Sequence, residues 1–235
     1  MIAFPPRIRL LACLALTPIS AGGATIHDHN TWVNFSLTGP LLDGQGGASR
    51  WRFTFDSPNR FGDNSRQYAQ GAWRAGLGYA LNSHWSIWAG GSYTRTDTPY
   101  SSVPYGEPRG FQQVLWTDRS GDFILQYRLR LEERFPDTGN DLGLRLRQQF
   151  RVSHPLPAFK PLSWVLWEEL FLNLNETDYG ARRGLDQNRA FVGLGWTWSE
   201  IVRSEAGYLH HFNRRPGRVD GVNHTLAVSL AITFK

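Results

Sequence analysis

Residues Val222 to Lys235 read VNHTLAVSLAITFK, and apolar side chains alternate with small or polar ones along almost the whole stretch. The apolar parity holds Val222, Leu226, Val228, Leu230, Ile232 and Phe234. A period of two is that of a β-strand with one apolar and one polar face. Strands of soluble sheets commonly run for about five or six residues, whereas this pattern is long enough to cross a bilayer at a tilt. The stretch therefore predicts a strand of an outer-membrane barrel.

The composition is compatible with such a barrel. The chain has 235 residues, 41% of them hydrophobic, and holds no apolar run of the length, about 18 residues, that a membrane-spanning helix needs. A barrel can be hydrophilic on average because half of each strand faces a polar interior. The 10 Trp, 14 Phe and 8 Tyr residues are typical of aromatic girdles at the two membrane surfaces. The formal charge of +5 does not favour nucleic-acid binding, because the arginines are interleaved with apolar strand positions.

The first 24 residues have the pattern of a secretory signal peptide. Arg7 and Arg9 precede an apolar run from Leu10 to Leu16, and small residues follow at positions 20–24. We expect cleavage there, which leaves residues 25–235 as the mature barrel in the bacterial outer membrane. The single cysteine, Cys13, falls in this leader, so no disulfide is expected in the mature protein.

The mature chain divides into strands by the same period. Eleven segments are predicted: Thr31–Leu37, Ser49–Phe55, Tyr68–Tyr79, Trp85–Arg95, Phe111–Thr117, Phe123–Glu133, Leu142–Arg151, Ser163–Asn173, Asp186–Trp198, Val202–Phe212 and Val222–Lys235. Bacterial barrels of one chain usually have an even number of strands. We therefore predict an all-β, antiparallel, up-and-down transmembrane barrel of twelve strands, with Ala24–Asn30 as the first. Ten strands remain the alternative. Turns on the periplasmic side are expected to be short and the outer loops longer.

Two adjacent carboxylates interrupt the pattern. Glu168 and Glu169 fall on opposite parities, so a regular strand would place one of them on the lipid face. An unpaired charge is unfavourable there. We expect a β-bulge between them to reset the register.

Charged side chains on the inner parity are the candidate functional residues. They are Arg74, Arg128, Arg130, Glu132, Arg145, Arg147, Glu169, Arg189, Arg203 and Glu205. Cross-strand ion pairs between them could fill a narrow, sealed barrel of purely structural role. Alternatively, the surplus of arginine lines a small channel or binds a small anionic solute. We favour the channel or solute-binding barrel. Arginines in the predicted outer loops, at positions 182, 183, 214, 215 and 218, suit contact with anionic lipopolysaccharide head groups.

Evidence for an enzyme is weaker. A lipid hydrolase would need a nucleophile within reach of a base. His210, His211 and His224 are candidate bases, but Ser204 and Ser229 lie too far along their strands, and His224 and Thr225 point to opposite faces. His27 and His29, with Asp28 between them, are a weak metal signal. No catalytic, cofactor-binding or metal-ligating residue is assigned.

Several motifs resemble those of the DUF2490 family of bacterial outer-membrane proteins of unknown function. They are a first strand led by Trp32, RLRLEER at 128–134, WEELFLNLN at 167–175, DQNR at 186–189, GLGW at 193–196 and GY at 207–208. The resemblance covers the mature chain and is most specific from Phe123 to Tyr208. It implies a barrel and an outer-membrane address, and it carries no reaction.

The last strand is also a candidate assembly signal. Barrel-insertion machinery recognises a terminal strand with an aromatic end, and here Phe234 is penultimate. The expected partners are therefore this machinery and the lipid and lipopolysaccharide of the outer membrane.

Overall fold

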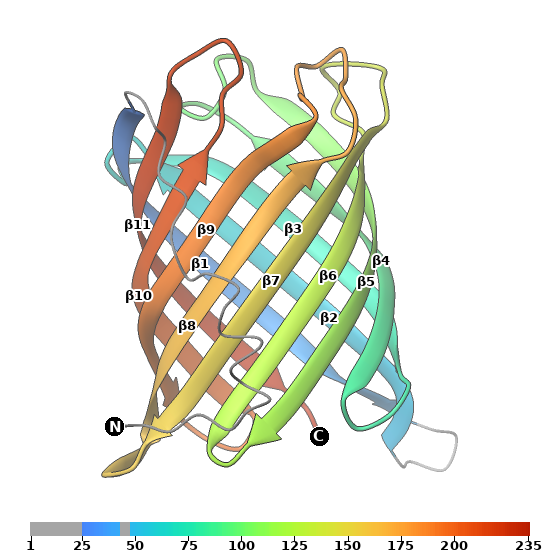
Figure 1. Cartoon of the computed structure of the whole chain (residues 1–235), viewed down its shortest axis with the longest axis vertical. Coiled ribbons are helices and arrows are strands. Elements are labelled where there is room, and N and C mark those ends of the chain that lie inside the picture. Colours follow the sequence, from blue (N-terminus) through green and yellow to red (C-terminus); the bar gives the residue numbers. More distant parts are fainter. Residues whose placement is uncertain (1–24, 43–47) are drawn as a thin grey trace.

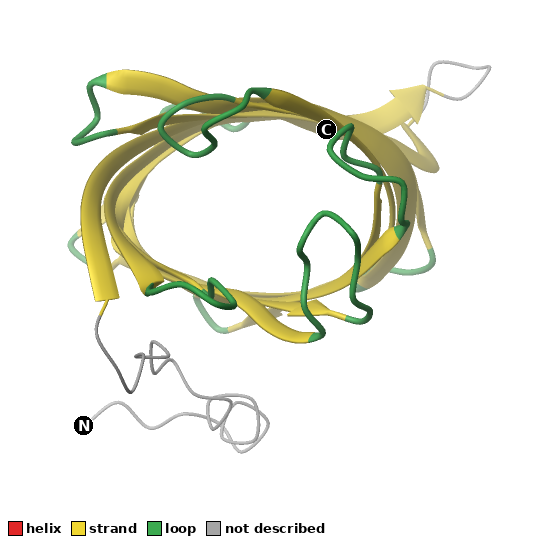
Figure 2. Cartoon of the chain, turned by 90° about the horizontal axis from the view of Figure 1, so that it is seen from above, coloured by secondary structure: helices red, strands yellow, loops and turns green. Residues whose placement is uncertain are grey.

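The chain forms a closed β-barrel (Figure 1). The computed structural model describes residues 25–42 and 48–235. Within them the wall has eleven strands: β1 Thr25–Leu42, β2 Ala48–Gly62, β3 Gln67–Ala80, β4 Trp85–Thr96, β5 Tyr105–Ser120, β6 Phe123–Arg134, β7 Gly143–Leu156, β8 Phe159–Asn173, β9 Gly184–Thr197, β10 Val202–Asn213 and β11 Asp220–Thr233. Seen along the axis, the wall is a flattened ring (Figure 2). The predicted all-β barrel is confirmed. The predicted signal peptide and Cys13 lie outside the described residues.

None of the described residues belongs to a helix that is long and apolar enough to span a membrane.

The barrel closes through a parallel pair. Successive strands pair antiparallel, but β1 and β11 pair in parallel, from Thr25 opposite Asp220 to Thr38 opposite Thr233. The prediction of twelve strands is wrong, because the residues expected to form an additional strand continue directly into β1. With an odd number, the first and last strands must run in the same direction. Parallel pairing is slightly weaker per residue than antiparallel pairing.

The two ends of the barrel differ in their connections. The connections at residues 97–104, 135–142, 174–183 and 214–219 are long, and they lie at one end, which we call the loop end, together with the four-residue turn at 63–66. Short ones, at 81–84, 121–122, 157–158 and 198–201, lie at the other, the turn end, together with the C-terminus (Figure 1). This matches the predicted alternation of long and short connections. Residues 81–84 join β3 and β4 into an antiparallel hairpin.

Two strands extend into segments that turn chemistry predicts as loops. β2 continues through Pro58 to Gly62, and β5 begins at Tyr105, before Pro108. Proline lacks only the N–H donor, so a strand tolerates it where that hydrogen bond is dispensable. Pairing of β2 with β3 skips from Asp56 to Asn59, which is where Pro58 lies.

The bulge predicted between Glu168 and Glu169 does not exist. Pairing of β8 with β7 runs without a shift from Ser163 to Asn173, and the irregularities of β8 lie elsewhere, next to Leu156 and after Phe171. The two carboxylates therefore do point to opposite faces, with Glu169 inside and Glu168 outside.

A small apolar core lies inside the barrel on one side. Val165 of β8, Phe191 of β9 and Leu209 of β10 are at most 5% exposed and contact one another. The Phe191 ring lies over Gly193 and Gly207, where an added Cβ would meet it. Because Gly193 and Gly207 have no side chains, the Phe191 ring can lie directly against the inner wall. The ring occupies interior space that would otherwise be open to the charged side chains.

Candidate functional site

The structure places all ten predicted lumen residues on the inner face of the wall, and each takes part in an ion pair. These ion pairs connect β2 with β3, and β8 with β9. They also connect β6 with both β7 and β8. Strand β7 is further connected with β8, with β9 and with β10. Most of these side chains are almost fully buried. The inner face is therefore a network of charges rather than a row of independent ones.

Glu169 is one centre of this network. It is 3% exposed, and its carboxylate lies 2.6 Å from the guanidinium of Arg128, 2.7 Å from that of Arg147 and 3.8 Å from that of Arg189. Three strands other than its own supply these arginines. A buried carboxylate of this kind is stable only because its partners are charged and hydrogen-bonded.

Glu132 is the second centre. Its carboxylate accepts hydrogen bonds from Arg145 at 2.7 Å and from Arg147 at 2.6 Å. Arg147 therefore bridges the two glutamates, and Arg145 extends the network to Asp186 at 2.9 Å. We call the set of Arg128, Arg130, Glu132, Arg145, Arg147, Glu169 and Arg189 the charged layer.

Aromatic rings complete the charged layer. Phe171 is 1% exposed, and the guanidinium groups of Arg147 and Arg189 lie 4.5 and 4.3 Å from its ring centre. Arg130 lies 4.4 Å from the ring centre of Phe111 in the same way. Guanidinium groups stack favourably on aromatic faces. The rings thus fill space between the arginines that ion pairs alone would leave open.

Two smaller ion-pair clusters flank the charged layer. Toward the loop end, Glu107 is held by Arg109 at 2.9 Å and Arg134 at 2.5 Å. Toward the turn end, Glu205 pairs with Arg203 at 2.9 Å and with Arg151. Glu107 and Arg109 were not among the predicted lumen residues, because they precede the predicted strand Phe111–Thr117. Arg151 shares the parity of Arg145 and Arg147, and that signal could have identified it.

Two hollows lie beside the charged layer. On the turn-end side lies the lumen cavity, of about 360 Å³. Its charged lining comprises six arginines, at positions 60, 74, 128, 147, 151 and 189, and three carboxylates, at 56, 169 and 205. A pocket of about 400 Å³ opens at the loop end beside Glu107, Arg134 and Tyr179. The linings of the two hollows share no residue, and only the lumen cavity has more arginines than carboxylates in its lining.

Arg60 is the least compensated cation of the lumen cavity. It donates to Gln70 at 2.5 Å and lies 4.1 Å from the ring centre of Trp32, but it forms no ion pair with any described residue. Arg189 lies against the same indole at 4.9 Å. The Trp32 ring therefore lies beside two guanidinium groups, and of these only that of Arg189 has a carboxylate partner among the described residues. Arg60 was not among the predicted lumen residues, because it lies beyond the end of the predicted strand Ser49–Phe55.

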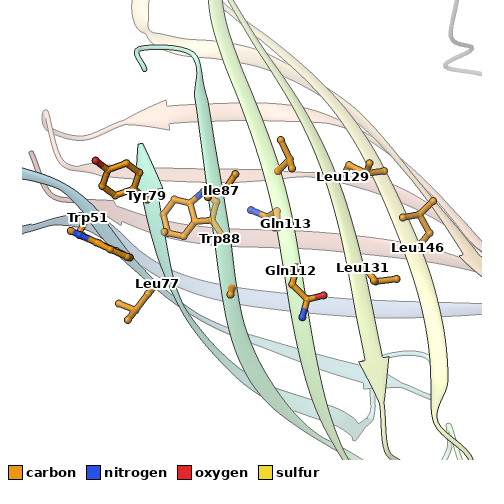
Figure 3. Close-up of a pocket in the computed structure, with 13 residues that line it drawn as sticks. Trp51, Leu77, Tyr79, Ile87, Trp88, Gln112, Gln113, Leu129, Leu131 and Leu146 are labelled. Carbon is orange, nitrogen blue, oxygen red and sulfur yellow. The ribbon is translucent and has the colours of Figure 1, made fainter. Parts of the chain in front are cut away.

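The outer wall carries an apolar groove of about 580 Å³ across β2 to β7 (Figure 3). Leu77, Ile87, Leu129 and Leu131 point into it, and Trp51 and Tyr79 stand at one end (Figure 3). The lining of the groove is mainly apolar, with Gln112 and Gln113 as its amide side chains, and among the described residues it holds no charged side chain.

The histidines considered as enzyme bases divide between the two faces. His211 is inside, 4% exposed, and its ring packs edge-on against Trp32 at 4.9 Å. His224 is outside, at the loop end, where it meets His27 and His29 of β1 across the parallel pair. His27 and His29 were considered only as weak metal ligands. Asp28 lies on the opposite parity, and no group of His, Cys, Asp and Glu in the described part of the chain has the arrangement of a metal site.

Comparison with known proteins gives a family and a relative. A model of the family "Protein of unknown function (DUF2490)" matches residues 29–223. An uncharacterised protein of Methylorubrum extorquens is 30% identical over 226 residues, which cover 94% of this chain and 95% of that protein. No solved structure matches the chain.

Proposed function

The chain belongs to the DUF2490 family, and we propose that it is an integral outer-membrane barrel whose lumen cavity binds a small anionic solute and does not conduct ions. The charged layer carries this proposal. Its ion pairs join strands that are not neighbours in the wall, and of the two hollows beside it only the lumen cavity has a mainly basic lining. The sequence favours a channel or a solute-binding barrel, and the geometry supports the second.

The outer face supports membrane placement. Trp73, Leu77, Val192 and Leu226 are each more than half exposed, and they lie on β3, β9 and β11. Water-exposed proteins rarely carry apolar surface of this extent, which marks contact with a membrane or a partner. A barrel with no free edge is also one of the two folds that satisfy all backbone hydrogen bonds within a bilayer.

Aromatic side chains gather at the turn end of the outer face. Trp51 packs with Tyr79 at 5.2 Å, Trp85 with Trp116 at 6.5 Å, and Phe159 with Trp196 at 5.3 Å, measured between ring centres. Trp and Tyr are enriched where membrane meets water. These pairs favour the turn end as one membrane surface, which we take as the periplasmic one because periplasmic turns are short.

In this orientation the lumen cavity faces the periplasm. Six arginines against three carboxylates attract an anion, and Arg60 offers a guanidinium that no carboxylate occupies. Guanidinium groups bind carboxylate and phosphate oxygens through paired hydrogen bonds. The loop arginines, among them Arg182 and Arg214, then face lipopolysaccharide, whose head groups are anionic.

Conductance in planar bilayers tests the closed lumen. The refolded protein is expected to insert without ion current. Steady anion-selective current from the wild-type barrel would show that the charged layer does not close the lumen, and it would restore the channel hypothesis.

Calorimetric titration with inorganic phosphate and with citrate tests the solute site. We expect binding to the wild-type barrel and a loss of about tenfold or more in Arg60→Gln, because an ionic hydrogen bond contributes about 1.5–3 kcal/mol. Arg119→Gln is the matched control, since Arg119 lies at the turn end outside the lumen cavity. Equal binding by both variants would contradict the site. A barrel that binds neither anion would favour the sealed, structural alternative.

A further inference from the structure

Four of the seven histidines lie together on the outer face at the loop end. His29 of β1 is opposite His224 of β11, His224 is opposite His210 of β10, and His27 is two residues from His29. A groove of about 520 Å³ adjoins this row and is lined by His29, Thr31, Ser65, Tyr208, His224 and Leu226. We call it the rim groove.

A chain of hydrogen bonds crosses three strands beside the rim groove. The Tyr208 hydroxyl is 2.7 Å from Nδ1 of His224, and Nε2 of His224 is 2.9 Å from Nδ1 of His27. Nε2 of His27 is in turn 2.8 Å from the Thr25 hydroxyl. With both imidazoles neutral, every contact is satisfied when Tyr208 donates to His224, His224 to His27, and His27 to Thr25. This arrangement gives a hydroxyl, a base that can take its proton, and a group that orients the base.

The rim groove lies at the edge of the exposed apolar surface. In the cross-strand row next to the histidines toward the turn end, Leu226 is 54% exposed, Tyr208 43% and Val192 52%. The row of His29, His224 and His210 is polar. An amphiphile whose acyl chain lies along Leu226 and Val192 would therefore place its polar linkage at Tyr208.

A strained turn forms the other wall of the rim groove. Asp63, Asn64 and Ser65 have φ values of 52°, 54° and 64°, which non-glycine residues rarely adopt. The Asp28 carboxylate accepts hydrogen bonds from the backbone N–H groups of Asp63 and Asn64, at 3.3 and 3.0 Å. The turn brings the Ser65 hydroxyl to 2.9 Å from that of Thr31. Such strain persists only where surrounding contacts hold it, and it is common at functional sites.

We propose that Tyr208, His224 and His27 form the base of a hydrolytic site for carboxylic esters of membrane amphiphiles. This substrate class rests on the proposed membrane placement. The Tyr208 oxygen takes a proton from a water molecule as its own proton passes to Nδ1 of His224. The water oxygen bonds to the acyl carbon, and collapse of the tetrahedral adduct breaks the bond to the alcohol oxygen, which receives the proton back through Tyr208. One ester and one water give one acid and one alcohol. His27 is a positioning residue that accepts the hydrogen bond of the charged His224.

Hydrolysis of p-nitrophenyl esters by the refolded full-length barrel tests the site. A butyrate ester in solution reports the base alone, and a palmitate ester in detergent micelles reports the amphiphile preference. We expect both to be cleaved, palmitate with the higher kcat/KM. Positioned acid–base groups contribute about 10²–10⁴-fold to rate, so Tyr208→Phe and His224→Gln are each expected to lose about 100-fold or more. Absent hydrolysis, or full activity in Tyr208→Phe, would overturn the proposal.

His154→Gln is the matched control. His154 is also an outer-face histidine, but it lies near the turn end, stacked on Trp164 at 5.8 Å between ring centres. It is expected to leave both activities unchanged, and a loss equal to that of His224→Gln would overturn the assignment. His27→Ala should lower kcat with little change in KM, and His27→Gln, which keeps an acceptor, should recover part of it; equal rates in both would remove His27 from the site.

Flotation with phospholipid vesicles separates this proposal from the membrane placement. A protein that cleaves butyrate but neither floats with vesicles nor prefers palmitate has the base without the membrane. A protein that floats and cleaves neither ester has the membrane without the base, and the hydrolytic site is then wrong.

Discussion

Glu168 and Glu169 are adjacent in sequence, yet they have opposite environments. Glu169 points inward, is 3% exposed and has three arginine partners. Glu168 points outward and accepts one hydrogen bond, from the side-chain amide of Asn188 at 2.8 Å. Asn188 is itself fully buried, although it is on the outer face. The inner face thus satisfies a charge with charges, whereas the outer face satisfies it with a neutral donor.

This difference shows how the barrel accommodates an ionisable group on each side. A β-strand offers no choice about alternation, so a pair of consecutive carboxylates must face both ways unless a bulge intervenes. The wall keeps its register and supplies a local partner instead. A neutral amide suits a face that is otherwise apolar, because it adds no second charge.

Replacing Glu169 should have the largest effect on this comparison. Glu169→Gln leaves Arg128, Arg147 and Arg189 without their shared carboxylate in a buried layer. Removal of one partner from a buried ion pair typically costs about 3–5 kcal/mol, since the remaining charge stays uncompensated. The free energy of unfolding in detergent micelles, followed by tryptophan fluorescence during a urea titration, should fall by that amount.

Glu168→Gln is the matched control at the neighbouring position. The glutamine oxygen can still accept the hydrogen bond from Asn188, so we expect a change within about 1 kcal/mol. Equal losses in the two variants would show that the inner ion pairs do not dominate, and the contrast between the faces would fail.

Phe234 provides an intermediate test on the outer side. Its backbone N–H donates to the Thr38 carbonyl at 2.8 Å, and its ring lies 6.1 Å from that of Phe53, so it covers the line where the barrel closes. Phe234 is 44% exposed, and partial burial of a phenyl ring is worth about 1 kcal/mol. Phe234→Ala is expected to lower the yield of heat-modifiable, folded barrel without altering anion binding in the lumen cavity.

Phe135→Ala controls for loss of an exposed ring, since Phe135 is 51% exposed and lies at the loop end, away from the closing pair. Unimpaired assembly of Phe234→Ala, or equal impairment of both variants, would refute a specific role for the terminal strand.

The alternating pattern predicted the barrel and its inward charges because a strand has only two faces. Arg128, Arg145 and Glu169 share the inner parity of their strands, and their common location on the inner face follows from it. The pattern could not show which arginine meets which carboxylate, since those contacts join strands whose relative shift depends on the whole ring. Arg147, which bridges Glu132 and Glu169, is recognisable only from that shift.

Other features could not be predicted from the alternating pattern, because strands of this barrel contain prolines that usually indicate loops. Pro58 and Pro108 indicated loops, but both lie in strands, so Arg60, Glu107 and Arg109 were missed. The rim groove combines β1, β10, β11 and the turn before β3. It depends on the parallel pairing of β1 with β11, which an even strand count had excluded. His27 and His224 are 197 residues apart, and no local signal joins them.

Asp178 gives the smallest and sharpest extension of the comparison, because it is a carboxylate satisfied by backbone donors at the loop end. The N–H groups of Asn140 and Asp141 donate to it at 2.8 and 3.2 Å, and these hydrogen bonds lower the pKa of Asp178. A lowered pKa means that the charged form stabilises the contact between loops 135–142 and 174–183 above the ordinary aspartate pKa. This contribution is lost as the pH falls through the lowered value.

Hydrogen exchange at the amides of Asn140 and Asp141, corrected for the intrinsic rate, should therefore show protection at neutral pH that declines in acid. Asp178→Asn should have weaker protection and no such decline. The effect should be small because Asp178 is exposed to solvent. A pH profile shared by the two proteins would assign the contact to the loop backbone alone.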